Sequence, residues 1–289
     1  MRRGGESSLK IGLVLEGGGM RGVFTAGVLD SFLDNEINVD VCIGVSAGAC
    51  LACSYLCKQR GRGFSVMTDY LDDKDYCSFS SLLRTGDMFG AEFLYHKIPE
   101  ELYPIDNAAF QRGATEFYTV VTNCDTGIPE YPEITDMLRD VEYVRASSSL
   151  PLLSRIVEIG DKRYLDGGVS DPIPVQKAFE LGCDKVIVVL TQHRGYRKTA
   201  EKTLPLIRAR YRSFPNLVQD MQKRHDVYNE TLEQILQWEN AGNVFVIAPE
   251  NPLNIRRTEK CREILRGGYL QGKELTDRLI PYLREFIKE

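Results

Sequence analysis

The chain has 289 residues, a formal net charge of −5, 43% hydrophobic residues and 27% charged residues. That length can bury a sizeable core in one large α/β domain or two smaller ones, and the composition is typical of a globular protein. A net negative charge implies no domain-wide basic surface, so we expect no nucleic-acid partner. No apolar run approaches the ~18 residues that span a bilayer, and no secretory-type apolar stretch follows Met1–Glu6. We therefore expect a cytoplasmic protein.

Eight cysteines are expected to be reduced thiols in that compartment. Cys50, Cys53 and Cys57 follow one helical face, and the first two fit the Cys-x-x-Cys pattern of redox and metal sites. However, no histidine lies nearby, and the pair begins a full turn inside the expected helix, whereas a redox pair usually sits at a helix start. We expect these cysteines to be packing residues, and we expect the protein to need no metal and no organic cofactor.

The N-terminal part of the chain alternates between strand and helix patterns. Lys10–Leu15 predicts a strand that ends in a glycine-rich loop, and Arg21–Glu36 has the apolar spacing of a helix. Val41–Val45 predicts a second strand, and Ala47–Lys58 has a helical composition. Residues 60–113 are rich in turn-forming residues and predict an irregular insertion or lid.

The alternation continues to the C-terminus. The predicted strands are Glu116–Thr122, Arg155–Ile159, Lys162–Leu165, Lys185–Leu190 and Asn243–Ala248, with a hairpin turn at Gly160-Asp161. The predicted helices are Val175–Leu181, Asn216–Asn240 and several terminal helices within Thr258–Glu289. Strands alternating with helices imply a mostly parallel sheet covered on both sides, within a single domain 1–289.

The most informative stretch is Gly44-Val45-Ser46-Ala47-Gly48, which lies between a predicted strand and a predicted helix. A nucleophile elbow needs this spacing, because the serine backbone turns sharply and the flanking glycines let strand and helix pass closely. Ser46 is therefore the candidate nucleophile.

A glycine cluster, Gly17-Gly18-Gly19-Met20-Arg21-Gly22, follows the first predicted strand. It fits the Gly-x-Gly-x-x-Gly pattern of dinucleotide-binding folds, but the second strand ends without the carboxylate that would hold the ribose. The alternative is that its backbone N–H groups, with a helix dipole behind them, bind an oxyanion. Both loops follow parallel strands, so the glycines and Ser46 are expected at the same sheet edge.

A third cluster, Asp166-Gly167-Gly168, follows the predicted hairpin. Taken alone, it predicts only a turn in which the aspartate bonds local amides.

These three clusters, in this order, resemble the patatin-like phospholipase family. Ala146-Ser147-Ser148-Ser149-Leu150-Pro151 is similar to the stretch before that family's Asp-Gly-Gly, and the resemblance covers roughly residues 10–250. It implies a three-layer α/β/α sandwich with a nucleophile elbow, whose catalytic core is 10–250 and whose C-terminal helices in 251–289 pack on that core.

The resemblance also implies an acyl-ester hydrolase with a catalytic dyad, and we expect its substrate to be a lipid or another carboxyl ester. Ser46 would be the nucleophile and Asp166 the general base. The oxyanion hole would be formed by Gly17, Gly18 and Gly19. The supporting residues would be Arg21, Gly44, Gly48, Gly167 and Gly168.

Three alternatives stay open at this point. His193 follows a predicted buried strand, and the order Ser46, Asp166, His193 is that of an α/β-hydrolase triad, so a Ser-Asp-His esterase is an alternative mechanism. The acyl group could be transferred to an acceptor other than water. A non-catalytic lipid- or nucleotide-binding module would also retain the glycine loop.

The segment 194–212 is unusually basic for an acidic chain, with seven Arg or Lys residues against the single acid Glu201. Apolar and aromatic residues are interleaved with them. We expect this segment to allow peripheral contact with an anionic membrane surface, and its alternative is a solvated helix face.

Overall fold

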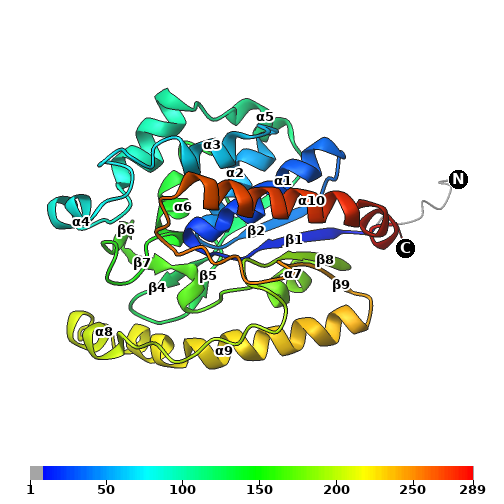
Figure 1. The fold of residues 1–289 in the computed structure, drawn as a ribbon. Helices are drawn as coiled ribbons and strands as arrows, with labels where there is room; N and C mark the ends of the chain where they lie inside the picture. Colours follow the sequence, from blue (N-terminus) through cyan, green and yellow to red (C-terminus); the bar gives the residue numbers. More distant parts are fainter. Residues whose placement is uncertain (1–8, 289) are drawn as a thin grey trace, which may run out of the picture.

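The computed structural model describes residues 9–288, and a five-stranded parallel sheet forms its centre (Figure 1). The segment Met1–Glu6, considered above as a secretory leader, lies outside the described residues. The strand order is β3-β2-β1-β8-β9, and each neighbouring pair is parallel. The bounds are β1 (Ile11–Leu15), β2 (Val41–Gly44), β3 (Glu116–Thr119), β8 (Lys185–Val189) and β9 (Val244–Ile247). The predicted parallel sheet is confirmed.

Helices cover both faces of this sheet and give the predicted three-layer α/β/α sandwich (Figure 1). Side chains of β1 alternate between the two interfaces, since Leu13 and Leu15 join one core cluster and Val14 joins the other. One face carries α1 (Val23–Asp34), α2 (Ala47–Leu56), α3 (Arg62–Thr68) and α10 (Arg262–Phe286); the other carries α7 (Val175–Glu180) and α9 (Pro215–Asn240). No helix within residues 9–288 is both long and apolar enough to cross a bilayer.

The C-terminal segment forms the one helix α10 within the described residues, where several helices were predicted. The helix lies against α1 at backbone distance, because a Cβ on Gly272 would lie 2.1 Å from the carbonyl oxygen of Phe24. A Cβ on Gly27 would be equally close to the carbonyl oxygen of Tyr269. The absence of side chains at these glycines lets the helices cross closely, which fixes where the preceding segment 248–261 runs.

A second, antiparallel sheet of four strands continues from the central one. Its order is β5-β4-β7-β6, with β5 (Pro129–Glu130), β4 (Val121–Asn123), β7 (Lys162–Asp166) and β6 (Val157–Ile159). The prediction of one strand over Glu116–Thr122 is wrong, because β3 pairs with β2 and β4 pairs with β7. The change occurs at Val120, whose N–H still donates to the Gly44 carbonyl at 3.1 Å. This split brings the end of β7 next to the end of β2.

Residues 60–113 are largely helical, so the prediction of an irregular segment is wrong for most of their length. They form α3, α4 (Phe79–Thr85), the π-helix η2 (Phe93–Leu102) and α5 (Asn107–Arg112). These helices are short, and two of them begin at side-chain caps: Ser78 accepts a hydrogen bond from Ser81 N at the start of α4, and Asp106 accepts one from Ala109 N at the start of α5. Such short elements have too few residues to show a helical period in the sequence.

Candidate active site

The carboxyl ends of the central strands bring the glycine-rich loop and the serine elbow together. Leu15 at the end of β1 pairs with Gly44 on one side and Val189 on the other, so the loops that follow these strands emerge side by side. In α/β sheets this edge is where ligands bind.

Ser46 occupies a tight turn between β2 and α2. Its backbone has φ 54° and ψ −124°, a region that residues with side chains rarely adopt. The Ser46 N–H donates to Ser147 Oγ at 2.9 Å. A Cβ on Gly44 would lie 2.5 Å from Ala49 Cα, and one on Gly48 would lie 2.4 Å from Leu15 O. The glycines two residues before and after the serine therefore permit the close passage that the turn requires.

The glycine-rich loop lies directly beside this serine. A Cβ placed on Gly17 would be 2.8 Å from Ser46 Cβ, and Gly19 has φ +57° at the start of the 3-10 helix η1 (Gly19–Gly22). Within residues 9–288, the backbone N–H groups of Gly17, Gly18 and Gly19 donate to no backbone or side-chain acceptor. Three adjacent unpaired donors are thus available to an anion at this position.

Asp166 ends β7 and comes from the second sheet to the same place. Its N–H donates to Ser149 O at 2.9 Å, and its Oδ1 accepts the Gly168 N–H at 2.8 Å. Gly167 and Gly168 begin the short 3-10 helix η3 (Gly167–Val169), so this turn fixes the carboxylate. The other oxygen, Oδ2, is buried and has no hydrogen-bond partner among the described residues.

Burial also sets the protonation of this carboxyl group. Asp166 is 1% exposed, and this burial raises its pKa above the ordinary aspartate value. The charge of Arg224 and the Ser46 hydroxyl oppose that shift. A carboxylate with a raised pKa and a free oxygen is a stronger proton acceptor than an exposed aspartate.

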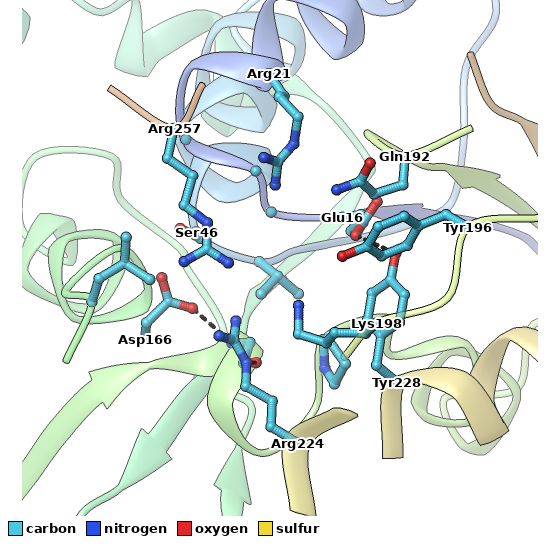
Figure 2. Close-up of a pocket in the computed structure, with 17 residues that line it drawn as sticks. Glu16, Arg21, Ser46, Asp166, Gln192, Tyr196, Lys198, Arg224, Tyr228 and Arg257 are labelled. Carbon is cyan, nitrogen blue, oxygen red and sulfur yellow. Dashed lines mark hydrogen bonds between the residues drawn. The ribbon is translucent and has the colours of Figure 1, made fainter. Parts of the chain in front are cut away.

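Two cavities of opposite character meet at Ser46. The apolar cavity encloses about 700 Å3 including its open mouth, and its wall includes Leu51 of α2, Met67 of α3 and Leu94 of η2. The polar cavity encloses about 490 Å3 on the other side of the serine and also contacts Asp166 (Figure 2). Ser46, Gly19 and Leu150 line both.

The polar cavity gathers the predicted residues and several that the motifs did not indicate. Ser46, Asp166, Arg21, Gly168 and the loop Gly17–Gly19 line it, whereas Gly44, Gly48 and Gly167 are not among its lining residues. The additional polar side chains are Glu16, Gln192, Tyr196, Lys198, Arg224, Tyr228 and Arg257 (Figure 2).

The carboxylate of Glu16 accepts hydrogen bonds from both hydroxyl and amide donors. Its carboxylate accepts hydrogen bonds from Thr191 N, at 2.6 Å, and from the Tyr228 hydroxyl, at 2.8 Å. The residue is 5% exposed. An acid placed between an apolar strand and three glycines was a signal that sequence analysis could have used.

Arg21 extends its side chain into the cavity (Figure 2), and its buried Nε has no hydrogen-bond partner among the described residues. Burial lowers its pKa, an effect that the charge of Glu16 opposes. The Arg21 N–H also donates to Gly18 O at 3.3 Å. The residue therefore contacts the glycine-rich loop and also adds charge to the cavity.

The three histidines lie away from the serine. His193 Nδ1 lies 2.8 Å from Arg194 O and its ring packs against Tyr196, and it does not line either cavity that meets at Ser46. His96 contacts Glu142, at 3.2 Å, and His225 lies 3.4 Å from Asp226. No described histidine contacts the Asp166 carboxylate.

Of the cysteines, only Cys50 reaches a cavity wall near the serine. Its Sγ lies 3.3 Å from Ser148 Oγ, and burial raises its pKa, so the thiol is held neutral. Cys53 and Cys57 pack in the hydrophobic core cluster that also contains Leu13 and Leu15 of β1. Residues 9–288 contain no cluster of three or more His, Cys, Asp or Glu side chains that could hold a metal ion.

The fold and the site define the class of this protein: an α/β/α sandwich with a serine on a strand-to-helix elbow, opposite a buried aspartate. Comparison with known families then gives its membership. A family model described as patatin-like phospholipase matches residues 13–179, and the chain belongs to that family. Residues 214–288 match a second family, described as a domain of unknown function (DUF6363).

Named relatives and one solved structure are similar to parts of this chain. The chain is 34% identical over 189 residues to the uncharacterized protein YjjU of Escherichia coli K12, covering 63% of this chain and 52% of YjjU. It is 28% identical over 301 residues to lysophospholipase nte1 of Aspergillus terreus, covering 93% of this chain and 18% of that protein. Among solved structures, VipD from Legionella pneumophila matches with a TM-score of 0.43 and 13% identity, over 94% of this chain and 67% of VipD. The chain therefore spans about half the length of YjjU and under a fifth of the fungal protein.

Proposed function

We propose that the protein hydrolyses acyl esters of lipids, with Ser46 as nucleophile and Asp166 as general base. The observation that carries this proposal is the buried, partner-free Oδ2 of Asp166 beside a serine on an elbow, between an apolar and a polar cavity. Membership of the patatin-like phospholipase family supports it.

The chemistry proceeds in two steps. Ser46 Oγ attacks the ester carbonyl carbon while its proton passes to Asp166, and the tetrahedral intermediate collapses to an acyl-serine as the proton passes to the leaving alcohol. Asp166 then removes a proton from water, and the resulting hydroxide attacks the acyl-serine. The products are a fatty acid and free Ser46, whose oxygen regains the proton from Asp166. Burial of the carboxylate favours proton acceptance in both steps.

The three unpaired amides of Gly17, Gly18 and Gly19 would stabilise the negative oxygen of each tetrahedral intermediate. Loss of one such donor typically costs ~3–4 kcal/mol of transition-state stabilisation. Their position beside Ser46 Cβ supports this role.

The apolar cavity would hold the acyl chain. Its wall is formed mainly by α2 and by the segment 60–113, so the segment predicted as a lid would contribute to the chain-binding site. The relatives named lysophospholipases support an ester of this kind. We expect the length of residues 60–113 and the bulk of their side chains to set acyl-chain preference.

Labelling with a fluorophosphonate probe, followed by mass spectrometry of the modified residue, tests the dyad. Wild type, Asp166→Asn and His193→Ala are compared after circular dichroism has shown that each is folded. We expect labelling at Ser46 that survives His193→Ala and is lost in Asp166→Asn. Loss in the histidine variant would replace the dyad by a triad, and unlabelled, folded wild type would favour a binding module.

Product analysis completes this test. Fatty acid is the product expected from an ester substrate in water. If added alcohols or lysolipids received the acyl group in preference to water, the protein would be an acyltransferase and the hydrolase assignment would be overturned.

Peripheral contact with an anionic membrane through residues 194–212 remains part of the proposal. This segment contains α8 (Leu204–Arg210), where Leu206 is 59% exposed and Arg208 and Arg210 are also exposed. Each such basic residue contributes ~1 kcal/mol near an anionic surface. Co-sedimentation with anionic liposomes should therefore weaken as salt rises, and binding indifferent to lipid charge would contradict this contact.

A further inference from the structure

The outer wall of the polar cavity is formed by the part of the chain that follows the patatin-like match at 13–179. Gln192, Tyr196 and Lys198 come from the segment after β8, Arg224 and Tyr228 from α9, and Arg257 from the segment between β9 and α10. The last three fall within the domain of unknown function, residues 214–288. The two matched regions therefore build one cavity together.

This wall places an excess of positive charge next to Ser46. Four cations line the cavity, namely Arg21, Lys198, Arg224 and Arg257, against the two carboxylates Glu16 and Asp166. Within residues 9–288, none of the four cations has a carboxylate oxygen within 4.0 Å. Elsewhere arginines are paired closely, as in Arg145–Glu142 and Arg194–Glu239, both at 2.7 Å.

Burial makes this arrangement costly without a ligand. Arg224 is only 9% exposed, and a buried cation without a partner is strongly disfavoured. Its Nε donates to Gly168 O, which orients the guanidinium but does not neutralise it. Burial, together with the charges of Arg224 and Arg257, lowers the pKa of Lys198 to about 7. An anion in the cavity would remove the cost for all of these groups.

The available carboxylates cannot serve a cationic ligand. Glu16 already accepts from Thr191 and Tyr228, and Asp166 is the proposed base. The Lys198 ammonium lies over the Tyr228 ring, 4.8 Å from its centre, where a quaternary ammonium group would otherwise bind. Two arginines and a lysine converging on one small cavity match a phosphate, whose oxygens accept several charge-assisted hydrogen bonds at once.

We propose, on the basis of the hydrolase function above, that Lys198, Arg224 and Arg257 bind the phosphomonoester group of the substrate, which is an acyl ester of a glycerol phosphate. The acyl chain then lies in the apolar cavity and the phosphate in the polar cavity, with the ester carbonyl at Ser46 between them. The domain of unknown function supplies substrate selection in this arrangement. The segment of this domain that carries Arg257 is held beside the glycine-rich loop, because Met20 N donates to Arg257 O at 3.1 Å.

Paired substrates test the proposal. The value of kcat/KM is measured for 1-acyl-glycerol 3-phosphate and for the uncharged 1-acylglycerol of the same chain, both in the same neutral detergent micelles. We expect wild type to favour the phosphate ester by ~100-fold, since several charge-assisted hydrogen bonds distinguish the two. Lys198→Met and Arg257→Gln should each reduce this preference by ~10-fold or more, and Arg257→Lys should restore part of it.

Neighbouring cations that are exposed provide matched controls. Lys223→Met in α9 and Arg256→Gln beside Arg257 each remove one exposed positive charge next to a cavity cation, and neither residue lines the cavity. These variants should keep the wild-type preference. If the control variants lost as much preference for the phosphate ester as the cavity variants, general surface charge would explain the effect and the proposal would be overturned.

The remaining outcomes separate this inference from the hydrolase proposal. Hydrolysis of both esters at equal rates would overturn the phosphate site and leave the hydrolase intact, whereas hydrolysis of neither by folded wild type would overturn both. If the cavity variants lost kcat/KM equally for both esters, the cations would act on the charge of Asp166 or stabilise the oxyanion instead of binding the phosphate.

Inorganic phosphate distinguishes a substrate subsite from an effector site. We expect it to compete with the phosphate ester, and calorimetry with glycerol 3-phosphate should show binding to wild type that Lys198→Met weakens. If inorganic phosphate did not compete with the phosphate ester, or if glycerol 3-phosphate bound wild type and Lys198→Met equally, the cavity would not be the phosphate subsite and the proposal would be wrong.

Discussion

The strained backbone of Ser46 leads to a prediction that separates stability from catalysis. At φ 54° and ψ −124°, a residue with a Cβ typically carries ~1–3 kcal/mol of strain, and glycine adopts such a conformation freely. Ser46→Gly and Ser46→Ala both remove the hydroxyl and retain the N–H that donates to Ser147. They differ only in the Cβ, so the alanine variant keeps the strain that the glycine variant loses.

The expected difference follows from two opposing terms. Relief of ~1–3 kcal/mol is offset by ~0.5–1 kcal/mol, because glycine loses more backbone entropy on folding. Ser46→Gly should therefore exceed Ser46→Ala in free energy of unfolding by up to ~2.5 kcal/mol, equivalent to a Tm higher by up to ~4 °C in a chain of this size. Both variants should be inactive. Urea unfolding with unchanged m-values measures the difference, and an alanine variant at least as stable as the glycine variant would refute the reasoning.

Further predictions concern the reaction, its dependence on pH and the linked stability. Asp166→Asn should lower kcat for ester hydrolysis by ~10^4-fold, comparable to loss of a triad member, and fatty-acid release measures it. Because burial raises the pKa of Asp166, kcat/KM should fall as pH drops through that raised value. The free energy of unfolding should correspondingly decrease as pH rises from the ordinary aspartate pKa through the raised one, since the fold holds that proton more tightly. For the phosphate ester alone, kcat/KM should also fall above pH ~7 as Lys198 loses its charge, and Lys198→Met should remove only this limb of the pH profile. Gly18→Ala places a Cβ 2.7 Å from Thr191 Oγ1, so displacement of the loop should lower kcat by ~10^2–10^3-fold with little change in KM; an unchanged kcat would remove this amide from the oxyanion hole.

The features that the sequence predicted well are those that depend on local backbone geometry. The elbow at Ser46 and the glycine-rich loop each require a particular turn after a strand, so a few adjacent residues are enough to indicate them. The parallel sheet followed from the alternation of strand and helix patterns and is confirmed.

Features that depend on distant pairing could not be predicted in the same way. Nothing in Glu116–Thr122 indicates that the segment divides at Val120, because the division is set by pairing of β4 with β7, more than 40 residues later. The short helices of 60–113 were missed for a different reason. α4 and α5 begin at side-chain caps, α3 packs against α2, and these helices are too short to show a clear period.

The cations of the polar cavity are the main part of the site that motif analysis missed, although one of them had a visible signal. The buried face of α9 consists of Leu217, Met221, Arg224, Tyr228 and Ile235, which recur at helical spacing. An arginine within an otherwise largely apolar stripe is a charge that the fold must bury, and burial of a charge requires a partner or a ligand.

Whether the buried arginine has a charged partner or needs a ligand depends on the tertiary structure alone. Lys198 and Arg257 lie 26 and 33 residues from Arg224 along the chain, so only the position of α9 beneath the sheet and of α10 above it brings them together. A neighbouring element could have paired Arg224 with an acid, but Arg224 lies among other cations in the cavity beside Ser46. In the proposed reaction, the phosphate of the substrate is the anion that balances the charges that the fold leaves unpaired there.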